Sequence, residues 1–306
     1  MLQRNMSPAG IKLAHRLDLP LAARGPATYQ QDFVERYVPN HAWLLPQELA
    51  EELYALCGQG KTQPARSYGE RAFPRLLIDL SWNSSRLDGN RYSRHAAEEL
   101  LNGGAPRCDI DTVMLLNHRA AIEFLLDCVL REGLSTLVVQ NLHALLMRDL
   151  VPDGARLGPI RNSQLGIAGT LYSPMRDAEQ VERMLKSIVG KAALIKNPVE
   201  AAFFLWVNLA YLQPFDDGNN CTGRLVANIP LLLHGCAPLA FLGIDRDDYL
   251  QAMLGVYEYQ DVALAVDLFL VDLSSFGEQI RDAERHLRCV WHSDCRMSLA
   301  SCTGRR

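Results

Sequence analysis

The sequence predicts an all-α fold with one short β-hairpin. Apolar residues recur at helical spacing through most of the chain, and Pro, Gly and Ser residues separate the periodic segments. One stretch, residues 151–174, is rich in Gly and Pro and lacks that spacing, which favours a strand pair. With 306 residues and 48% hydrophobic composition, the chain can bury one large core or two modest ones.

Residues 1–40 show weak periodicity, so we expect an arm or a partly ordered extension there, and packing of this segment on the rest of the chain stays open. Residues 58–66 are interpreted as a linker, and residues after 288 as a tail. His118 and His143 fall inside long apolar helices and are interpreted as structural. The pattern predicts helices over 46–57, 73–87, 93–101, 109–131, 135–149, 177–191, 198–212, 225–234, 245–257 and 262–288.

Charge and cysteine content narrow the classes of function. Lys and Arg number 31 against 35 Asp and Glu, so the net charge of −4 suggests neither a nucleic-acid nor a membrane partner. No apolar run reaches the roughly 18 residues of a membrane span, and the N-terminus lacks a secretory signal pattern. The eight Cys residues are scattered, which is typical of reduced thiols in the cytoplasm.

One cysteine cluster stands out near the C-terminus. Cys289, His292 and Cys295 have a spacing that can seed a zinc site, and Cys302 follows. No second paired cysteine motif accompanies them. The pattern therefore favours thiols without a bound metal over a zinc site.

The stretch 212–225 lies between two apolar runs and is the most informative part of the chain. Pro214 disfavours helical geometry at Gln213, so the preceding helix should stop there. A turn over Asp217-Gly218-Asn219 follows, and Thr222 is expected to cap the next helix. Such a loop directs several backbone N–H groups at one point and favours an anion.

Asp216 and Asp217 beside this turn could hold a divalent cation that bridges to phosphates. A plain polar turn between two core helices is the alternative, because short turn motifs often match by chance.

This stretch resembles the core motif of the Fic/Doc (Fido) family, which reads His-Pro-Phe-x-Asp/Glu-Gly-Asn-Gly-Arg-x-x-Arg. The positions that match are Pro214, Phe215, Asp217, Gly218, Asn219 and Arg224. The departures are Gln213 for the catalytic His, Asn220 for the second Gly and Cys221 for the first Arg. A Gln cannot act as a base near neutral pH, and a Cys in place of the Arg removes a fixed positive charge from the phosphate site.

The segment that ends Ser84-Ser85-Arg86-Leu87-Asp88-Gly89 resembles the inhibitory helix of the same family, with Asp88 in place of Glu. The resemblance implies that Asp88 pairs with Arg224 and competes with a nucleotide phosphate for that side chain. Ser84 and Gly89 fit the same motif. An ordinary helix end is the alternative, since Gly89 is also a C-cap signal.

The predicted hairpin covers Gln164–Tyr172 and follows Arg161. In Fic proteins a hairpin flap at this point in the chain binds the target segment by strand addition. The resemblance therefore implies a flap made by Gly166, Ile167, Ala168, Gly169 and Thr170. An ordinary surface loop is the alternative.

The resemblance covers about residues 73–270 and implies a Fido-type helical bundle. We expect an N-terminal arm and helix (1–70), an inhibitory-helix region (71–110), a Fic core (111–275) and a C-terminal helix end and tail (276–306).

Fic proteins typically transfer AMP from ATP to a hydroxyl of a target protein, so the resemblance implies ATP and Mg²⁺ as cofactors. It places Asp217 at the metal and Gln213 at the position of the catalytic His. The target protein would bind through the flap. The nucleotide would contact Phe215, Gly218, Asn219, Asn220, Cys221 and Arg224.

Three functions stay open at this level. The first is a nucleotide-binding protein with slow or altered AMP transfer, inhibited by Asp88. The second is an inactive Fic-fold protein that binds or regulates a partner. The third is a hydrolase that removes a modification, with Asp88 orienting water. A homodimer also stays open, since an apolar helix face can serve a core or a second copy.

Overall fold

The computed structural model describes residues 6–57 and 77–272. The predicted linker, the start of the 73–87 helix, the end of the last predicted helix and the cysteine cluster of the tail lie outside these residues. The domain boundaries stay predictions.

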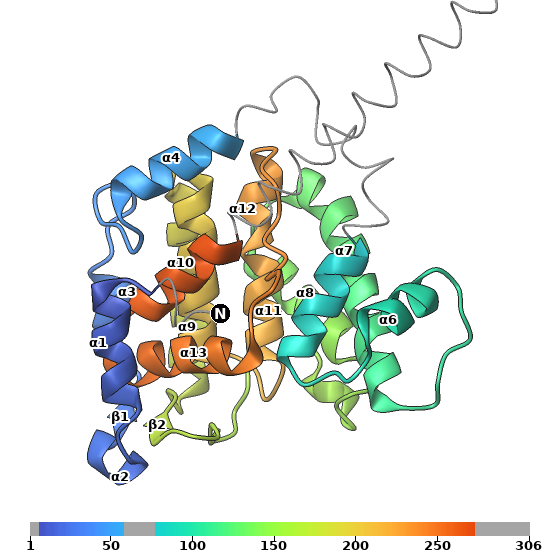
Figure 1. The fold of residues 1–306 in the computed structure, drawn as a ribbon, viewed down its shortest axis with the longest axis horizontal. Helices are drawn as coiled ribbons and strands as arrows, with labels where there is room; N and C mark the ends of the chain where they lie inside the picture. Colours follow the sequence, from blue (N-terminus) through green and yellow to red (C-terminus); the bar gives the residue numbers. More distant parts are fainter. Residues whose placement is uncertain (1–5, 58–76, 273–306) are drawn as a thin grey trace, which may run out of the picture.

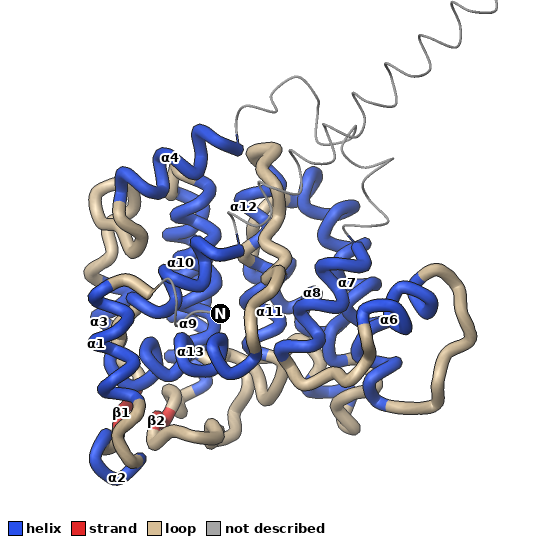
Figure 2. The backbone as a smooth tube through the Cα atoms, viewed as in Figure 1, coloured by secondary structure: helices blue, strands red, loops and turns tan. Residues whose placement is uncertain are grey.

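Helices make up most of the described structure, as the sequence predicts (Figure 1; Figure 2). Two more helical segments cover residues 77–87 and 263–272. Within the described ranges, no helix has both the length and the apolar character needed to cross a membrane. The labelled helices are α1 (Pro8–Leu17), α2 (Leu21–Arg24), α3 (Asp32–Glu35), α4 (Gln47–Cys57), α6 (Arg94–Leu101), α7 (Ile110–Glu132), α8 (Thr136–Met147), the 3₁₀ turn η3 (Gly154–Arg156), α9 (Ala178–Leu194), α10 (Pro198–Leu212), α11 (Asn219–Val226), α12 (Asn228–Leu233) and α13 (Arg246–Tyr259).

Helix α10 is the centre of the core. All of its residues are buried, and it packs against α4, α9, α11, α12 and α13. Asn197 caps its start by accepting hydrogen bonds from the N–H groups of Val199 and Glu200, and Pro198 occupies the first turn. A helix that is buried on every side has no face for solvent, so its stability comes from packing inside such a bundle.

From residue 6 onward, the N-terminal segment that was predicted as an arm or extension packs on this bundle, which is one of the arrangements that its sequence left open. Figure 1 shows α1 and α3 along one side of the core, and α1 packs against α13. The buried carboxylate of Glu200 on α10 accepts hydrogen bonds from the Tyr37 hydroxyl and from the N–H groups of Leu44 and Leu45. Short helices with weak periodicity hid these tertiary contacts from a search based on pattern.

The prediction of a β-hairpin over Gln164–Tyr172 was wrong. Strand β2 (Tyr172–Ser173) pairs in parallel with β1 (Ala27–Thr28), which comes from the N-terminal segment (Figure 2). Residues 164–171 form a loop. The flap segment therefore receives its strand partner from more than 140 residues away, which no local turn signal encodes.

We predict that Glu200→Ala lowers the free energy of unfolding by about 3 kcal/mol, because it leaves three buried donors without an acceptor. Denaturant unfolding measures this change. Glu179→Ala is the matched control, since Glu179 also lies in the first turn of a helix but is exposed. Equal losses in both variants would contradict the anchoring role of Glu200.

Candidate phosphate-binding loop

The loop after α10 begins at Gln213, whose backbone is left-handed with φ 51°. Pro214 follows, so the helix ends where the sequence predicts. Asn219 closes the turn: its side-chain oxygen accepts from the Phe215 N–H, and its side-chain nitrogen donates to the Phe215 carbonyl, both at 2.8 Å. The Asn219 side chain is therefore used to hold the loop.

Gly218 adopts φ 67° and caps α11. A Cβ atom at this position would lie 2.3 Å from Sδ of Met147, so both conformation and space require glycine. Helix α11 then starts at Asn219. The prediction that Thr222 caps a helix from Leu225 was wrong, because the cap is Gly218, four residues before Thr222. The Thr222 hydroxyl donates to the Gly218 carbonyl instead.

The first turn of α11 is open. Its first backbone hydrogen bond runs from the Thr222 N–H to the Gly218 carbonyl at 3.0 Å. Within the described structure, no hydrogen bond engages the N–H groups of Asn219, Asn220 and Cys221. Free N–H groups at a helix start carry partial positive charge and can bind an anion.

Arg161 connects this loop to the flap segment through hydrogen bonds. Its side chain is 1% exposed, and its guanidinium donates to the backbone carbonyls of Gln213, Ser163 and Met175 at 2.6–2.9 Å. Its backbone N–H also donates to the Pro214 carbonyl. The sequence marks Arg161 only as the residue before the flap, since the carbonyls that it binds are brought together by the fold.

His143 on α8 supports the loop from the other side. Its ring stacks on Phe215, with ring centroids 3.9 Å apart. Nδ1 accepts from the Gly158 N–H, so Nε2 carries the proton and donates to the Asp217 carbonyl at 3.1 Å. Burial lowers the pKa of His143 to about 4. The structural role predicted for His143 is confirmed, and its partners are those of the loop.

Gln213 points into a buried polar network. Its side-chain nitrogen donates to the Ala210 carbonyl at 2.7 Å and to the Tyr257 hydroxyl at 3.1 Å. The Tyr257 hydroxyl donates in turn to the side-chain oxygen of Asn220 at 3.2 Å. Two positions that depart from the family motif, Gln213 and Asn220, are thus linked through one tyrosine.

Arg224 lies inside the protein with 1% of its surface exposed. Its Nε and Nη2 donate to the hydroxyl and carbonyl oxygens of Ser84, and Nη2 also contacts Asp88 at 2.5 Å. The predicted pair of Asp88 and Arg224 is therefore confirmed. Burial acts to lower the pKa of Arg224, but the charge of Asp88 raises it above its usual value. Nη1 is buried without a hydrogen-bond partner.

The two acids of the turn differ in their surroundings. Asp217 is exposed and accepts from the Gly218 N–H at 2.7 Å. Asp216 is half-buried, hydrogen-bonds with the Ser163 hydroxyl and lies 3.8 Å from Arg156. Asp217 is therefore the acid free to meet a ligand from solvent.

The predicted flap residues lie beside this loop but do not form a hairpin. Arg24, in the N-terminal segment, donates to the Gly169 carbonyl at 2.8 Å and pairs with the buried side chain of Glu258 on α13. Gly166, Ile167 and Ala168 lie on an exposed or half-buried loop, and Thr170 is buried. The N-terminal segment therefore fixes both ends of the flap's second half, through Arg24 and β1.

We predict that acid removes stability through His143. Its folded pKa of about 4 lies below the unfolded value of 6.5, so the stabilisation is present above pH 6.5 and is lost as the pH falls toward 4. The loss amounts to about 3 kcal/mol. Denaturant unfolding gives the free energy of unfolding of the wild type and of His143→Gln at each pH between 4 and 7. The free energy of the wild type should fall more steeply with decreasing pH than that of the variant. Equal pH dependence in the two proteins would contradict the prediction.

Comparisons with known proteins relate this chain to one family. Residues 133–231 match the Fic/DOC family. The chain is 24% identical over 204 residues to the protein adenylyltransferase Fic of Nematostella vectensis, covering 63% of this chain and 45% of that protein. It is also 24% identical over 209 residues to the protein of the same name in Aedes aegypti, covering 65% and 39%. The chain spans less than half the length of these relatives.

Solved structures show the same fold. A Fic family protein from Desulfovibrio desulfuricans G20 superposes with a TM-score of 0.64 at 19% identity, covering 81% of this chain and 78% of that one. Fic-1 of C. elegans superposes with a TM-score of 0.66 at 20% identity, covering 78% and 73%. The chain therefore has the Fic-domain fold with a small two-stranded sheet, and its residues 133–231 match the Fic/DOC family.

Proposed function

We propose that this protein binds ATP with its phosphates at the first turn of α11, and that it transfers AMP to protein hydroxyls slowly. The main observation behind the proposal is the open first turn of α11. Three N–H groups without acceptors begin α11, and its one arginine, Arg224, has a buried Nη1 without a partner. Both features suit a phosphate chain, which supplies acceptor oxygens and negative charge.

The metal part of the proposal rests on Asp217. A single exposed carboxylate is a poor site for Mg²⁺ alone. It is a suitable one when phosphates and water complete the six oxygen ligands, as Mg²⁺ prefers. Bound there, Mg²⁺ would neutralise phosphate charge, while the open turn of α11 orients the phosphates.

Two substitutions make the transfer slow. Gln213 cannot take a proton from the attacking hydroxyl, and general-base catalysis is commonly worth about 10²–10⁴ in rate. The Gln213 side chain is moreover held by Ala210 and Tyr257. Cys221 offers no positive charge to the outer phosphates, which leaves Arg224 as the cation of the site.

Asp88 is the proposed inhibitor. Its carboxylate holds the same guanidinium that a phosphate would need. The Asp88 side chain is 24% exposed, whereas Arg224 is buried, so opening the pair moves Asp88 and its turn outward. Binding of the nucleotide must then outweigh a charge-assisted hydrogen bond, which is worth about 1.5–3 kcal/mol.

A protein that binds a partner without catalysis is the second candidate. The fixed position of Gln213 favours it, because no nearby side chain replaces the missing base among the contacts of Gln213. The partner would bind along loop 164–169, whose exposed backbone can accept an added strand.

The third candidate is a hydrolase in which Asp88 orients a water molecule. This function requires Asp88 to leave Arg224.

We predict that Asp88→Gly binds Mg²⁺·ATP about 10–100-fold more tightly than the wild type, because nothing then competes for Arg224. Asp88→Asn keeps the side-chain shape without the charge, and we expect an intermediate affinity. Calorimetric titration measures all three proteins. Arg224→Lys, which keeps a charge without the forked geometry, should bind weakly. A folded Asp88→Gly variant that binds no nucleotide would overturn the proposal.

We predict that Gln213→His in the Asp88→Gly background raises the rate of AMP transfer from labelled ATP by about 10²-fold or more, since a base returns to the site. Incorporation of label into the protein itself, together with release of free AMP, measures this rate. Asp217→Ala in the same background is the control, and it should abolish the gain. An unchanged rate with intact ATP binding would favour the non-catalytic binding protein.

A further inference from the structure

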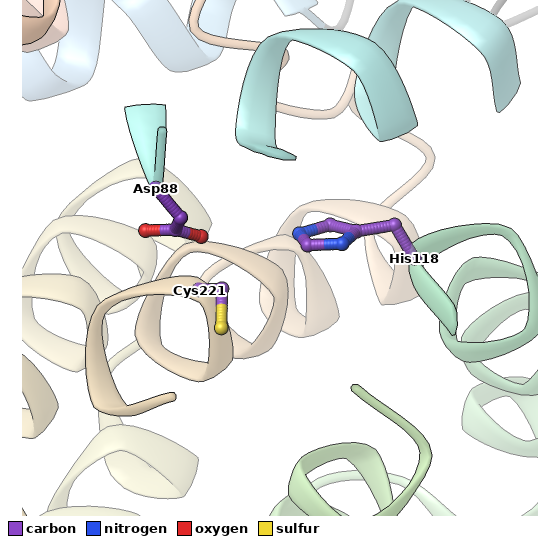
Figure 3. Close-up of side chains that lie close together, drawn as sticks. All are labelled: Asp88, His118 and Cys221. Atoms are coloured by element: carbon purple, nitrogen blue, oxygen red, sulfur yellow. The ribbon is translucent and has the colours of Figure 1, made fainter. Parts of the chain in front are cut away.

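A cluster of three chemically reactive side chains lies where three elements meet (Figure 3). Asp88 follows the 77–87 helix, His118 belongs to α7 and Cys221 to α11. One ligand atom from each lies within 4.8 Å of the other two. The proposed function does not use His118, and the Fic motif has an arginine where this chain has Cys221, so the cluster is a property of this sequence.

His118 is prepared to act as a ligand. Its Nδ1 lies 2.9 Å from the carbonyl oxygen of Met114, and a carbonyl can only accept, so Nδ1 carries the proton. Nε2 therefore has a free lone pair. It is buried and has no hydrogen-bond partner among residues 6–57 and 77–272, and the whole residue is 1% exposed. Figure 3 shows the ring extending from α7 toward the Asp88 carboxylate.

This arrangement is the usual one for a histidine that binds a metal. The ring nitrogen that does not bind the ion donates to a backbone carbonyl, which fixes the tautomer and the orientation of the ring. An unpaired buried nitrogen costs free energy in the absence of a ligand, and a bound cation removes that cost.

We propose that Asp88, His118 and Cys221 bind one Zn²⁺ ion, with water as the fourth ligand. A thiolate, an imidazole and a carboxylate are the donors that zinc takes, and three protein ligands with one open position form a common zinc geometry. Tetrahedral ligands around zinc lie about 3.5 Å apart, given bonds of about 2.0–2.3 Å. Side-chain movements of about 1 Å therefore close the site.

The charges of the cluster are compatible with a divalent cation. Cys221 now donates its thiol hydrogen to the Gly218 carbonyl at 3.1 Å, and on metal binding this proton would leave to solvent. Asp88 holds Arg224 through one carboxylate oxygen, Oδ2, and its other oxygen can face the ion. The two anionic ligands then offset the two charges of the zinc, and because Asp88 is shared with Arg224, the site keeps one net positive charge.

Zinc at this position would tie the turn that carries Asp88 to α7 and α11. It would hold Asp88 in contact with Arg224 and so strengthen the proposed inhibition. Zinc binding itself does not depend on nucleotide binding, so either proposal can fail without the other.

The test uses the full-length chain, freed of metal with a chelator and titrated with Zn²⁺ against a chromophoric competitor. We expect one tight site in the wild type and at least about 100-fold weaker binding in both Cys221→Ser and Asp88→Asn, since losing a direct ligand costs no less than losing a supporting residue. Cys236→Ser is the matched control, because Cys236 is buried to the same extent as Cys221. The double variant Cys289→Ser/Cys295→Ser reports on the tail cysteines. Both controls should bind as the wild type does.

Co²⁺ substitution gives a second readout that does not depend on stability. A thiolate-to-metal absorption band is expected in the wild type and is expected to be absent in Cys221→Ser. If Cys221→Ser fails to fold, Asp88→Asn decides through its affinity. Absence of zinc binding in the wild type, or a site lost with the tail cysteines and kept in Cys221→Ser, would overturn the proposal.

Discussion

The end of a fully buried helix places the strongest constraint on this structure. Helix α10 has no solvent-facing side, so the loop that follows it begins inside the protein. Each polar group of that loop needs a partner there, because unpaired buried groups cost free energy. Arg161 supplies donors to its carbonyls, Asn219 closes its turn, and His143 packs beneath Phe215. Among the described residues, the open N–H groups at the start of α11 are an exception, and they are the groups that the proposed phosphate site uses.

A second constraint comes from the buried cation. Arg224 has few partners inside the protein, and one of its nitrogen atoms has none among the described residues. A buried guanidinium needs anionic oxygens, whether they come from Asp88 or from a phosphate. In the proposed function, inhibition by Asp88 and binding of a phosphate are thus two ways of satisfying the same guanidinium. The exposure of Asp88 makes the internal partner the one that can leave.

The departures from the Fic motif belong together in the structure. Gln213 and Asn220 share the hydroxyl of Tyr257, so replacing the histidine does not leave an unfilled space. Cys221 lies next to His118 and Asp88, where an arginine would bring a second positive charge. Each of these three residues therefore has hydrogen-bond partners of its own in this structure.

Much of the fold could be predicted from the sequence. The helical class, the end of α10 at Gln213 and the pair of Asp88 and Arg224 were predicted correctly, since they follow from periodicity, from proline chemistry and from a specific motif. The failures were of another kind. The contacts of the N-terminal segment could not be predicted because its helices are short, and the flap was wrongly predicted as a hairpin because its turn residues suit one.

By itself the sequence determined the helices, the turn at Gly218 and the residue types at the site, because these depend on neighbours along the chain. Only the tertiary structure decided the rest. It paired β1 with β2, brought the Gln213 and Met175 carbonyls to Arg161, and set the tautomers of His118 and His143 through their partners. Contacts between residues far apart in the chain are set by packing of the whole bundle, and no local pattern contains them.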